Sequence, residues 1–213
     1  MERWCDPKKV SEIHNWGPLD AIPRELSEGN WLASKQIPHG APRVIYSGTL
    51  GLKHNPELIN KAAELNPSVT FIVVAAGVGL DALRANLKEN VHVLPLQPFE
   101  DFPKALASAD LFIAMIEPDA GLFSVPSKVL SYLCAGKPIV LASPAENLAA
   151  QIIEDAGAGV VVDPDTADAL GLEIKHLLED ETRRKSMGLA ARAYAEEHFD
   201  IRGVADKFEA IFQ

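Results

Sequence analysis

Short apolar runs alternate with amphipathic segments along the chain after residue 42. The runs predict β-strands at residues 43–48, 69–75, 91–94, 110–116, 138–142 and 159–163. The segments between them have the period of helices, at residues 56–65, 79–87, 100–109 and 146–156, and a further helix ends before Gly136. Strands such as FIVVA are apolar throughout, which is typical of parallel strands covered by helices on both faces. The alternation therefore predicts an α/β protein with a doubly wound parallel sheet of about six strands.

The two ends of the chain differ from this alternating region. Residues 1–42 combine charges, three tryptophans and a polar stretch ending in QIPHGAP, so we expect a connecting segment there. Only helical patterns follow Asp163, and in the one at residues 181–198 we expect Met187, Leu189 and Tyr194 near the buried side. The expected organisation is a linker at 1–42 followed by a Rossmann-like domain at 43–213, with helices on both faces of its sheet and extra C-terminal helices.

Composition narrows the class of protein. A formal net charge of −10 argues against a nucleic-acid surface, which needs Lys and Arg to neutralise phosphates. Cys5 and Cys134 are far apart, so we expect reduced thiols in a cytoplasmic protein. The N-terminus has no apolar core typical of a signal peptide, and the run 69–78 is too short to span a bilayer. The six histidines lack metal-ligand spacing, so no bound metal is expected.

The stretch from Glu117 to Val140 joins a loop of small residues to the start of a helix. Ser124 or Ser127 suits the N-cap, and Pro126 suits the first turn. The free N–H groups and the dipole of a helix N-terminus attract anions, and Lys128 adds a positive charge. We therefore expect a phosphate or diphosphate there, although an ordinary helix cap beside a solvated lysine would give the same local pattern.

Two other loops follow strands at the same expected edge of the sheet. In YSGTLGLKHNP, Gly48 and Gly51 allow close approach of the backbone and Lys53 can reach a phosphate. A plain turn between strand and helix is the alternative interpretation. The loop AAGVGLDA, residues 75–82, fits the dinucleotide pattern G-x-G-x-x-A, but the strand at 91–94 does not end in the acid that would hold a ribose. NAD is therefore the weaker candidate ligand.

Taken together, the segments YSGTLGLKHNP, VHVLPLQPFED, ADLFIAMIEP and VPSKVLSYLCAGKPIV resemble the C-terminal, nucleotide-sugar-binding domain of GT-B glycosyltransferases. More narrowly, they look like the retaining family four, group one. The resemblance covers about residues 10–210, and EIHNWGPLD is similar to the interdomain linker of that family. It implies the donor-binding half of an enzyme whose N-terminal acceptor domain is absent from this chain, either by excision or because that half is a separate chain. Alone, this half is expected to be inactive.

The resemblance also implies the chemistry and partners. The whole enzyme would move a sugar from a nucleoside-diphosphate sugar, of UDP or GDP type, to an acceptor sugar or lipid-linked sugar. Polysaccharide or glycoconjugate synthesis in the cytoplasm is the expected setting, at the membrane periphery in the full-length enzyme, with no cofactor. Two alternatives stay open: half of a sugar-nucleotide epimerase, and a non-catalytic nucleotide-binding or partner-binding Rossmann module.

Several positions match the motifs of the family and others depart from them. Gly48 and Lys53 match its first loop, whereas Thr49 stands where arginine is usual. Residues 126–128 resemble a Pro-Ser-Lys branch, and Ser131 stands at a usual glutamate. By the same resemblance the segment Leu94 to Pro98 would lie against the nucleotide base, and no catalytic residue is assigned. The expected substrate-binding residues are Gly48, Thr49, Gly51, Lys53, Leu96, Glu117, Ser124, Val125, Ser127, Lys128 and Ser131.

Overall fold

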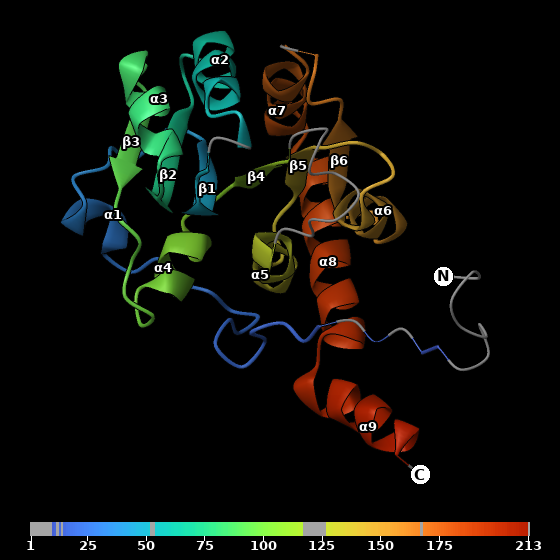
Figure 1. The fold of residues 1–213 in the computed structure, drawn as a ribbon. Helices are drawn as coiled ribbons and strands as arrows, with labels where there is room; N and C mark the ends of the chain where they lie inside the picture. The colour runs from blue at the N-terminus through green and yellow to red at the C-terminus, as the bar shows by residue number, and fades with distance from the viewer. Residues whose placement is uncertain are drawn as a thin grey trace.

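The computed structural model describes residues 10, 11, 13, 15–51, 54–116, 127–166 and 168–212. Six parallel strands form one sheet in the order β3-β2-β1-β4-β5-β6 (Figure 1). Their bounds are β1 (Arg43–Thr49), β2 (Thr70–Ala76), β3 (Val91–Leu94), β4 (Leu111–Met115), β5 (Ile139–Ala142) and β6 (Gly159–Val162). The predicted strands and the doubly wound parallel sheet are confirmed, with each strand end within one residue of its predicted place.

Helices cover both faces of this sheet (Figure 1). One face packs against α2 (Glu57–Leu65), α3 (Gly79–Ala85) and α7 (Ala169–Glu179). The other packs against α1 (Trp31–Ser34), α4 (Phe102–Ala107), α5 (Ser127–Ala135), α6 (Leu148–Asp155) and α8 (Glu181–His198). The last helix, α9 (Ile201–Ile211), extends beyond the end of α8. The short helix α1 was not predicted, and its Trp31 and Leu32 are buried in the core.

Successive residues of each strand point to opposite faces, as the pleat of a strand requires. In β1, Val44 and Tyr46 pack with α2, α3 and α7, whereas Ile45 packs on the other face with Phe112 of β4. The chain runs outward from β1 to β3 on one side and from β4 to β6 on the other. The strand order therefore reverses between β1 and β4, and ligands of such sheets bind at the carboxyl ends of the strands beside this reversal.

Helix α8 packs against α5 through small residues. Gly188, Ala191 and Ala195 are its buried positions, and a Cβ on Gly188 would lie only 2.5 Å from the carbonyl oxygen of Gly136. The expectation that Leu189 lies near the buried side is wrong, because its side chain is 74% exposed. Met187 and Tyr194 are partly buried and pack against the core, as expected. The close approach of α8 to α5 selects small residues, so Leu189 was assigned to the wrong side.

Helix α8 also holds the N-terminal segment in place. The amide of Gly17 donates to the carbonyl of Phe199, just beyond the end of α8, at 3.0 Å. Arg192 Nη1 donates to the carbonyl oxygens of Ile22 and Cys134, each at 2.6 Å. The Cys134 thiol is free and buried, and burial raises its pKa to about 12, so it stays protonated at neutral pH.

Candidate functional site

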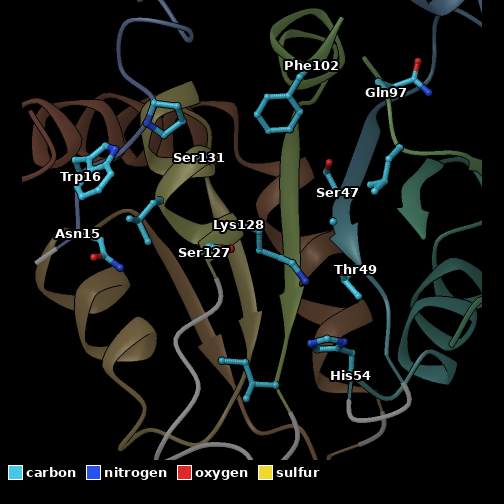
Figure 2. A pocket seen from close by; sticks show the side chains of 15 residues that line it. Asn15, Trp16, Ser47, Thr49, His54, Gln97, Phe102, Ser127, Lys128 and Ser131 are labelled. Atoms are coloured by element: carbon cyan, nitrogen blue, oxygen red, sulfur yellow. The ribbon is translucent and has the colours of Figure 1, made fainter. Parts of the chain in front are cut away.

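A cavity of about 700 Å³ opens at the carboxyl ends of β1 and β4, where the strand order reverses (Figure 2). Its walls are the end of β1, the first turns of α5, the segment after β3, the start of α4 and the N-terminal segment. The described residues that line it are Asn15, Trp16, Pro18, Ser47, Gly48, Thr49, His54, Leu96, Gln97, Phe102, Ile116, Ser127, Lys128, Leu130 and Ser131.

Many of the residues predicted from the sequence meet at this cavity. Those that line it are Gly48, Thr49, Leu96, Ser127, Lys128 and Ser131. Gly51 is not among the lining residues, but its amide donates to Nδ1 of His54, which is, at 2.8 Å. The other predicted residues lie outside the described part of the chain: Lys53, Glu117, Ser124 and Val125.

Lys128, in the first turn of α5, brings the positive charge of the cavity. Its side chain points toward the end of β1, close to Thr49 (Figure 2). The ammonium nitrogen donates to the hydroxyl of Tyr46 at 2.6 Å and lies 4.1 Å from the centre of that ring. With histidine counted as neutral, Lys128 is the only formally charged residue among the described lining residues. The cavity is thus locally positive on a chain of net charge −10.

The Lys128 side chain passes close to the backbone of Gly48, where there is no Cβ in its way. Gly48 has a φ of +131°, in the region that L side chains rarely adopt. A Cβ at this position would lie 3.2 Å from Cε of Lys128. Any larger residue would therefore both strain the end of β1 and crowd the lysine.

Two buried tyrosines hold the end of β1. The Tyr46 hydroxyl donates to the carbonyl oxygen of Thr49 at 2.7 Å. The Tyr132 hydroxyl accepts from the amide of Ser47 at 2.7 Å and donates to its carbonyl at 3.2 Å, while its ring stacks on Phe112. Burial raises the pKa of both tyrosines well above the ordinary value, so both hydroxyls stay protonated. The loop that borders the cavity is therefore fixed by neutral hydrogen bonds from within the core.

Residues 27–194 of the chain match the family model described as glycosyl transferases group 1. The chain belongs to the group 1 glycosyltransferases. This confirms the family that the sequence motifs indicated.

Related proteins are also glycosyltransferases, and they are longer than this chain. A GDP-mannose-dependent monoacylated alpha-(1-6)-phosphatidylinositol monomannoside mannosyltransferase of Corynebacterium glutamicum is 27% identical over 153 residues, which is 69% of this chain and 39% of the relative. Anabaena Alr3699/HepE, solved with UDP and glucose, has a TM-score of 0.81 at 19% identity, and the match covers 99% of this chain and 58% of that one. The chain therefore spans less than two thirds of the length of each of these relatives.

A solved structure of similar extent shows which part of the fold this is. The C-terminal domain of the group 1 family protein LpcC from Francisella tularensis has a TM-score of 0.68 at 13% identity, covering 86% of this chain and 98% of that domain. The fold of this chain is accordingly that of the C-terminal domain of a GT-B glycosyltransferase.

In this glycosyltransferase domain the glycines of the dinucleotide-like pattern have a packing role. Gly77 has a φ of +127°, and a Cβ there would lie 2.5 Å from the carbonyl oxygen of Leu50. The amide of Gly79 donates to the same oxygen at 2.9 Å. The turn after β2 thus packs directly on the loop after β1, which explains both glycines without a bound dinucleotide.

Some lining residues of the domain were missed from the sequence. His54, like the other histidines, lacks metal-ligand spacing, and no motif predicts that its Nδ1 accepts from the Gly51 amide. Trp16 is 54% exposed at the cavity, and its only signal was the likeness of Asn15-Trp16 to the linker of the family. Tyr46 does not line the cavity but bonds to Lys128, which does, and in the sequence it looks like a core residue of an apolar strand, which it also is.

The described lining residues include no Asp or Glu, so this part of the cavity can bind and stabilise charge but offers no carboxylate for proton transfer. Across the described ranges, no group of three or more His, Cys, Asp or Glu is placed to hold a metal ion. Every helix within those ranges is too short or too polar to cross a membrane.

Proposed function

We propose that this chain is the donor-binding half of a retaining glycosyltransferase, and that its cavity binds the diphosphate of a nucleoside-diphosphate sugar. The observation that carries the proposal is the position of Lys128. Its ammonium lies beside the reversal of strand order, in a cavity whose described lining holds no carboxylate, on an acidic chain. A diphosphate is the ligand that this local charge and this place in the sheet favour.

The geometry also supports a role in the reaction. When the sugar leaves, negative charge grows on the departing diphosphate, and a cation held beside it stabilises the transition state more than the ground state. Lys128 and the N–H groups at the start of α5, near Ser127, supply such a charge and dipole. We assign Lys53 the same role from its place in the sequence, outside the described residues.

The nucleoside would lie along the segment after β3. Leu96 and Gln97 line the cavity there. The Gln97 side chain is held by its own bonds, donating to the Pro95 carbonyl at 2.7 Å and accepting from Trp31 Nε1 at 3.4 Å. We therefore place the base against residues 94–98. The names of the relatives point to different donors, GDP-mannose in one and UDP with glucose in another, so a UDP-type or GDP-type donor is proposed without choosing between them.

We propose the following organisation for the whole enzyme. Residues 1–42 would be the linker, residues 43–213 the donor domain, and an N-terminal domain would supply the acceptor site. The acceptor would be a sugar or lipid-linked sugar, in polysaccharide or glycoconjugate synthesis on the cytoplasmic side. Without that domain the present chain would bind the donor but not transfer its sugar.

Thermal-shift and calorimetric titrations of the chain with UDP, GDP, ADP and their sugar conjugates test the proposal, with NAD as the control. A ligand at a hundred times its Kd stabilises by about 2.7 kcal/mol, which raises the melting temperature by several degrees. The expected result is a shift with one nucleoside diphosphate and its sugar conjugate that weakens in Lys128→Met. A shift with NAD alone would contradict the proposal. So would binding of a nucleoside diphosphate that is unchanged by Lys128→Met.

A further inference from the structure

The contact between Lys128 and Tyr46 joins the two faces of the sheet. Helix α5 covers the face formed by Ile45 and Phe112, whereas Tyr46 belongs to the cluster on the opposite face. To reach the Tyr46 hydroxyl, Lys128 passes over the carboxyl end of β1 at Gly48, where a Cβ would crowd its Cε. The long side chain is thus laid across the reversal of strand order instead of extending into solvent.

The bonding capacity of the tyrosine hydroxyl makes this contact directional. A phenol has one proton to donate, and Tyr46 gives it to the carbonyl oxygen of Thr49 at 2.7 Å. Burial raises the pKa of Tyr46, so the hydroxyl keeps that proton. Its remaining capacity is to accept, and the Lys128 ammonium donates to it at 2.6 Å. The main chain at Thr49 therefore orients the hydroxyl that accepts from the Lys128 ammonium.

We infer that Tyr46 is a positioning residue, which holds the Lys128 ammonium at the place where the donor diphosphate binds. The inference rests on the proposed function. A lysine side chain has several rotatable bonds, and a cation fixed before the ligand arrives loses less conformational freedom on binding than one that must be ordered. The gain is expected mainly for the charged part of the ligand, because the hydroxyl reaches the ligand through the ammonium, whereas its bond to the Thr49 carbonyl fixes the loop at the end of β1.

A double-mutant cycle between Tyr46→Phe and Lys128→Met tests the inference. Calorimetry measures the Kd of UDP and GDP for both single variants, the double variant and the wild-type chain, together with the Kd of uridine and guanosine. Tyr132→Phe is the matched control, since it also removes a buried hydroxyl bonded to the end of β1, in this case to the amide and carbonyl of Ser47. The melting temperature of each variant verifies folding.

We expect Tyr46→Phe to weaken the nucleoside diphosphate that binds by about tenfold. It should leave the corresponding nucleoside within about twofold, and it should cost clearly less in the K128M background than in the wild-type chain. The effect of Tyr132→Phe should be the same in both backgrounds. The inference is overturned if Tyr46→Phe weakens the nucleoside as much as the diphosphate, acts equally in the K128M background, or has no effect. Failure of the proposed function looks different, because then the wild-type chain binds no nucleoside diphosphate at all.

A measurement on the wild-type chain keeps the inference testable if Tyr46→Phe does not fold. The NMR order parameter of the Lys128 ammonium is expected to exceed that of Lys137, a half-buried lysine two residues after the end of α5 that forms no ion pair with another described residue. Equal order parameters would mean that the tyrosine does not hold the cation.

Discussion

Two cavities lie at opposite ends of the sheet and hold their positive charges in different ways. At the carboxyl ends of the strands, the described residues that line the first cavity include one cation, Lys128. Its ammonium donates a hydrogen bond to the neutral hydroxyl of Tyr46. The second cavity, of about 550 Å³, lies near the amino ends of β4 and β5. Its described cations are Arg24, Lys137, Arg184, Lys185 and Arg192. A count of positive charges would choose the second cavity as the anion site.

The bonds of those cations show why the count misleads. Arg192 Nε donates to Glu196 at 2.7 Å, and Lys185 pairs with Glu181 at 2.6 Å. Arg184 donates to main-chain carbonyls near the end of α7. Most of the cations in the second cavity are thus already bonded to carboxylates or to main-chain carbonyls of the chain itself. Lys128 differs in its surroundings: no carboxylate stands among the described residues that line its cavity, and its ammonium is oriented by the Tyr46 hydroxyl.

The sharpest test of the comparison removes Arg192. Arg192→Met leaves the carbonyls of Ile22 and Cys134 without their charged donor and Glu196 without one partner. We expect the free energy of unfolding to fall by about 3 kcal/mol, measured by urea denaturation. At temperatures where the variant is folded, the affinity for a nucleoside diphosphate should not change. A large loss of affinity in the folded variant would mean that the two ends of the sheet are coupled.

The converse variant, Lys128→Met, separates binding from stability in the other direction. Methionine keeps an unbranched apolar stem against Tyr46 but removes the ammonium. We expect the affinity for the nucleoside diphosphate to fall by about 2 kcal/mol, roughly 30-fold in Kd. The free energy of unfolding should change by less than about 1 kcal/mol. If Lys128→Met lost stability but bound the nucleoside diphosphate normally, the role of Lys128 would be to stabilise the fold and not to bind the ligand.

A smaller effect is expected from pH at the second cavity. Hydrogen bonds from Arg24 and then Arg192 lower the pKa of Glu196 from 4.5 to about 2. A carboxyl group with a lowered pKa in the folded state contributes stability above its ordinary pKa, and this is lost as the pH falls toward the folded value. Urea denaturation between pH 7 and about pH 2 should therefore show a shallower acid decline for Glu196→Gln than for the wild-type chain. Parallel curves would show that these ion pairs contribute little in solution.

The sequence predicted the layers of this fold well because each strand and helix has its own period. Fully apolar strands such as β2 indicate burial on both faces, and Gly136 ends α5 as expected. The short helix α1 escaped because a four-residue helix has no period to detect. The buried side of α8 was misassigned at Leu189 because close packing on α5 depends on small residues, which carry little hydrophobic signal.

The candidate site was predictable only where a residue type by itself indicates a kind of binding. A lysine in the first turn of a helix and glycines after a strand suggest phosphate, and Lys128 and Gly48 do line the cavity. Tyr46 could not be singled out, because a tyrosine in an apolar strand looks like any core residue. Tyr46 and Lys128 are 82 residues apart in sequence, so their contact depends on how β1 and α5 are placed in space. No local sequence pattern predicts that placement.

The smallest expected effect on affinity is that of a substitution at Lys137, and it tests directly whether the two ends of the sheet differ in anion binding. Lys137 lines the second cavity and follows α5, the helix that begins at the first cavity. Lys137→Met removes one positive charge from the chain, as Lys128→Met does, but at the opposite end of the sheet. If the position of the cation matters and the total charge does not, the affinity for nucleoside diphosphates should stay within about twofold at moderate salt, because charges beyond the Debye length are screened. Calorimetry on the two variants side by side decides this: a loss in Lys137→Met as large as that in Lys128→Met would assign the ligand to the second cavity or to long-range attraction, and the distinction between the two ends of the sheet would fail.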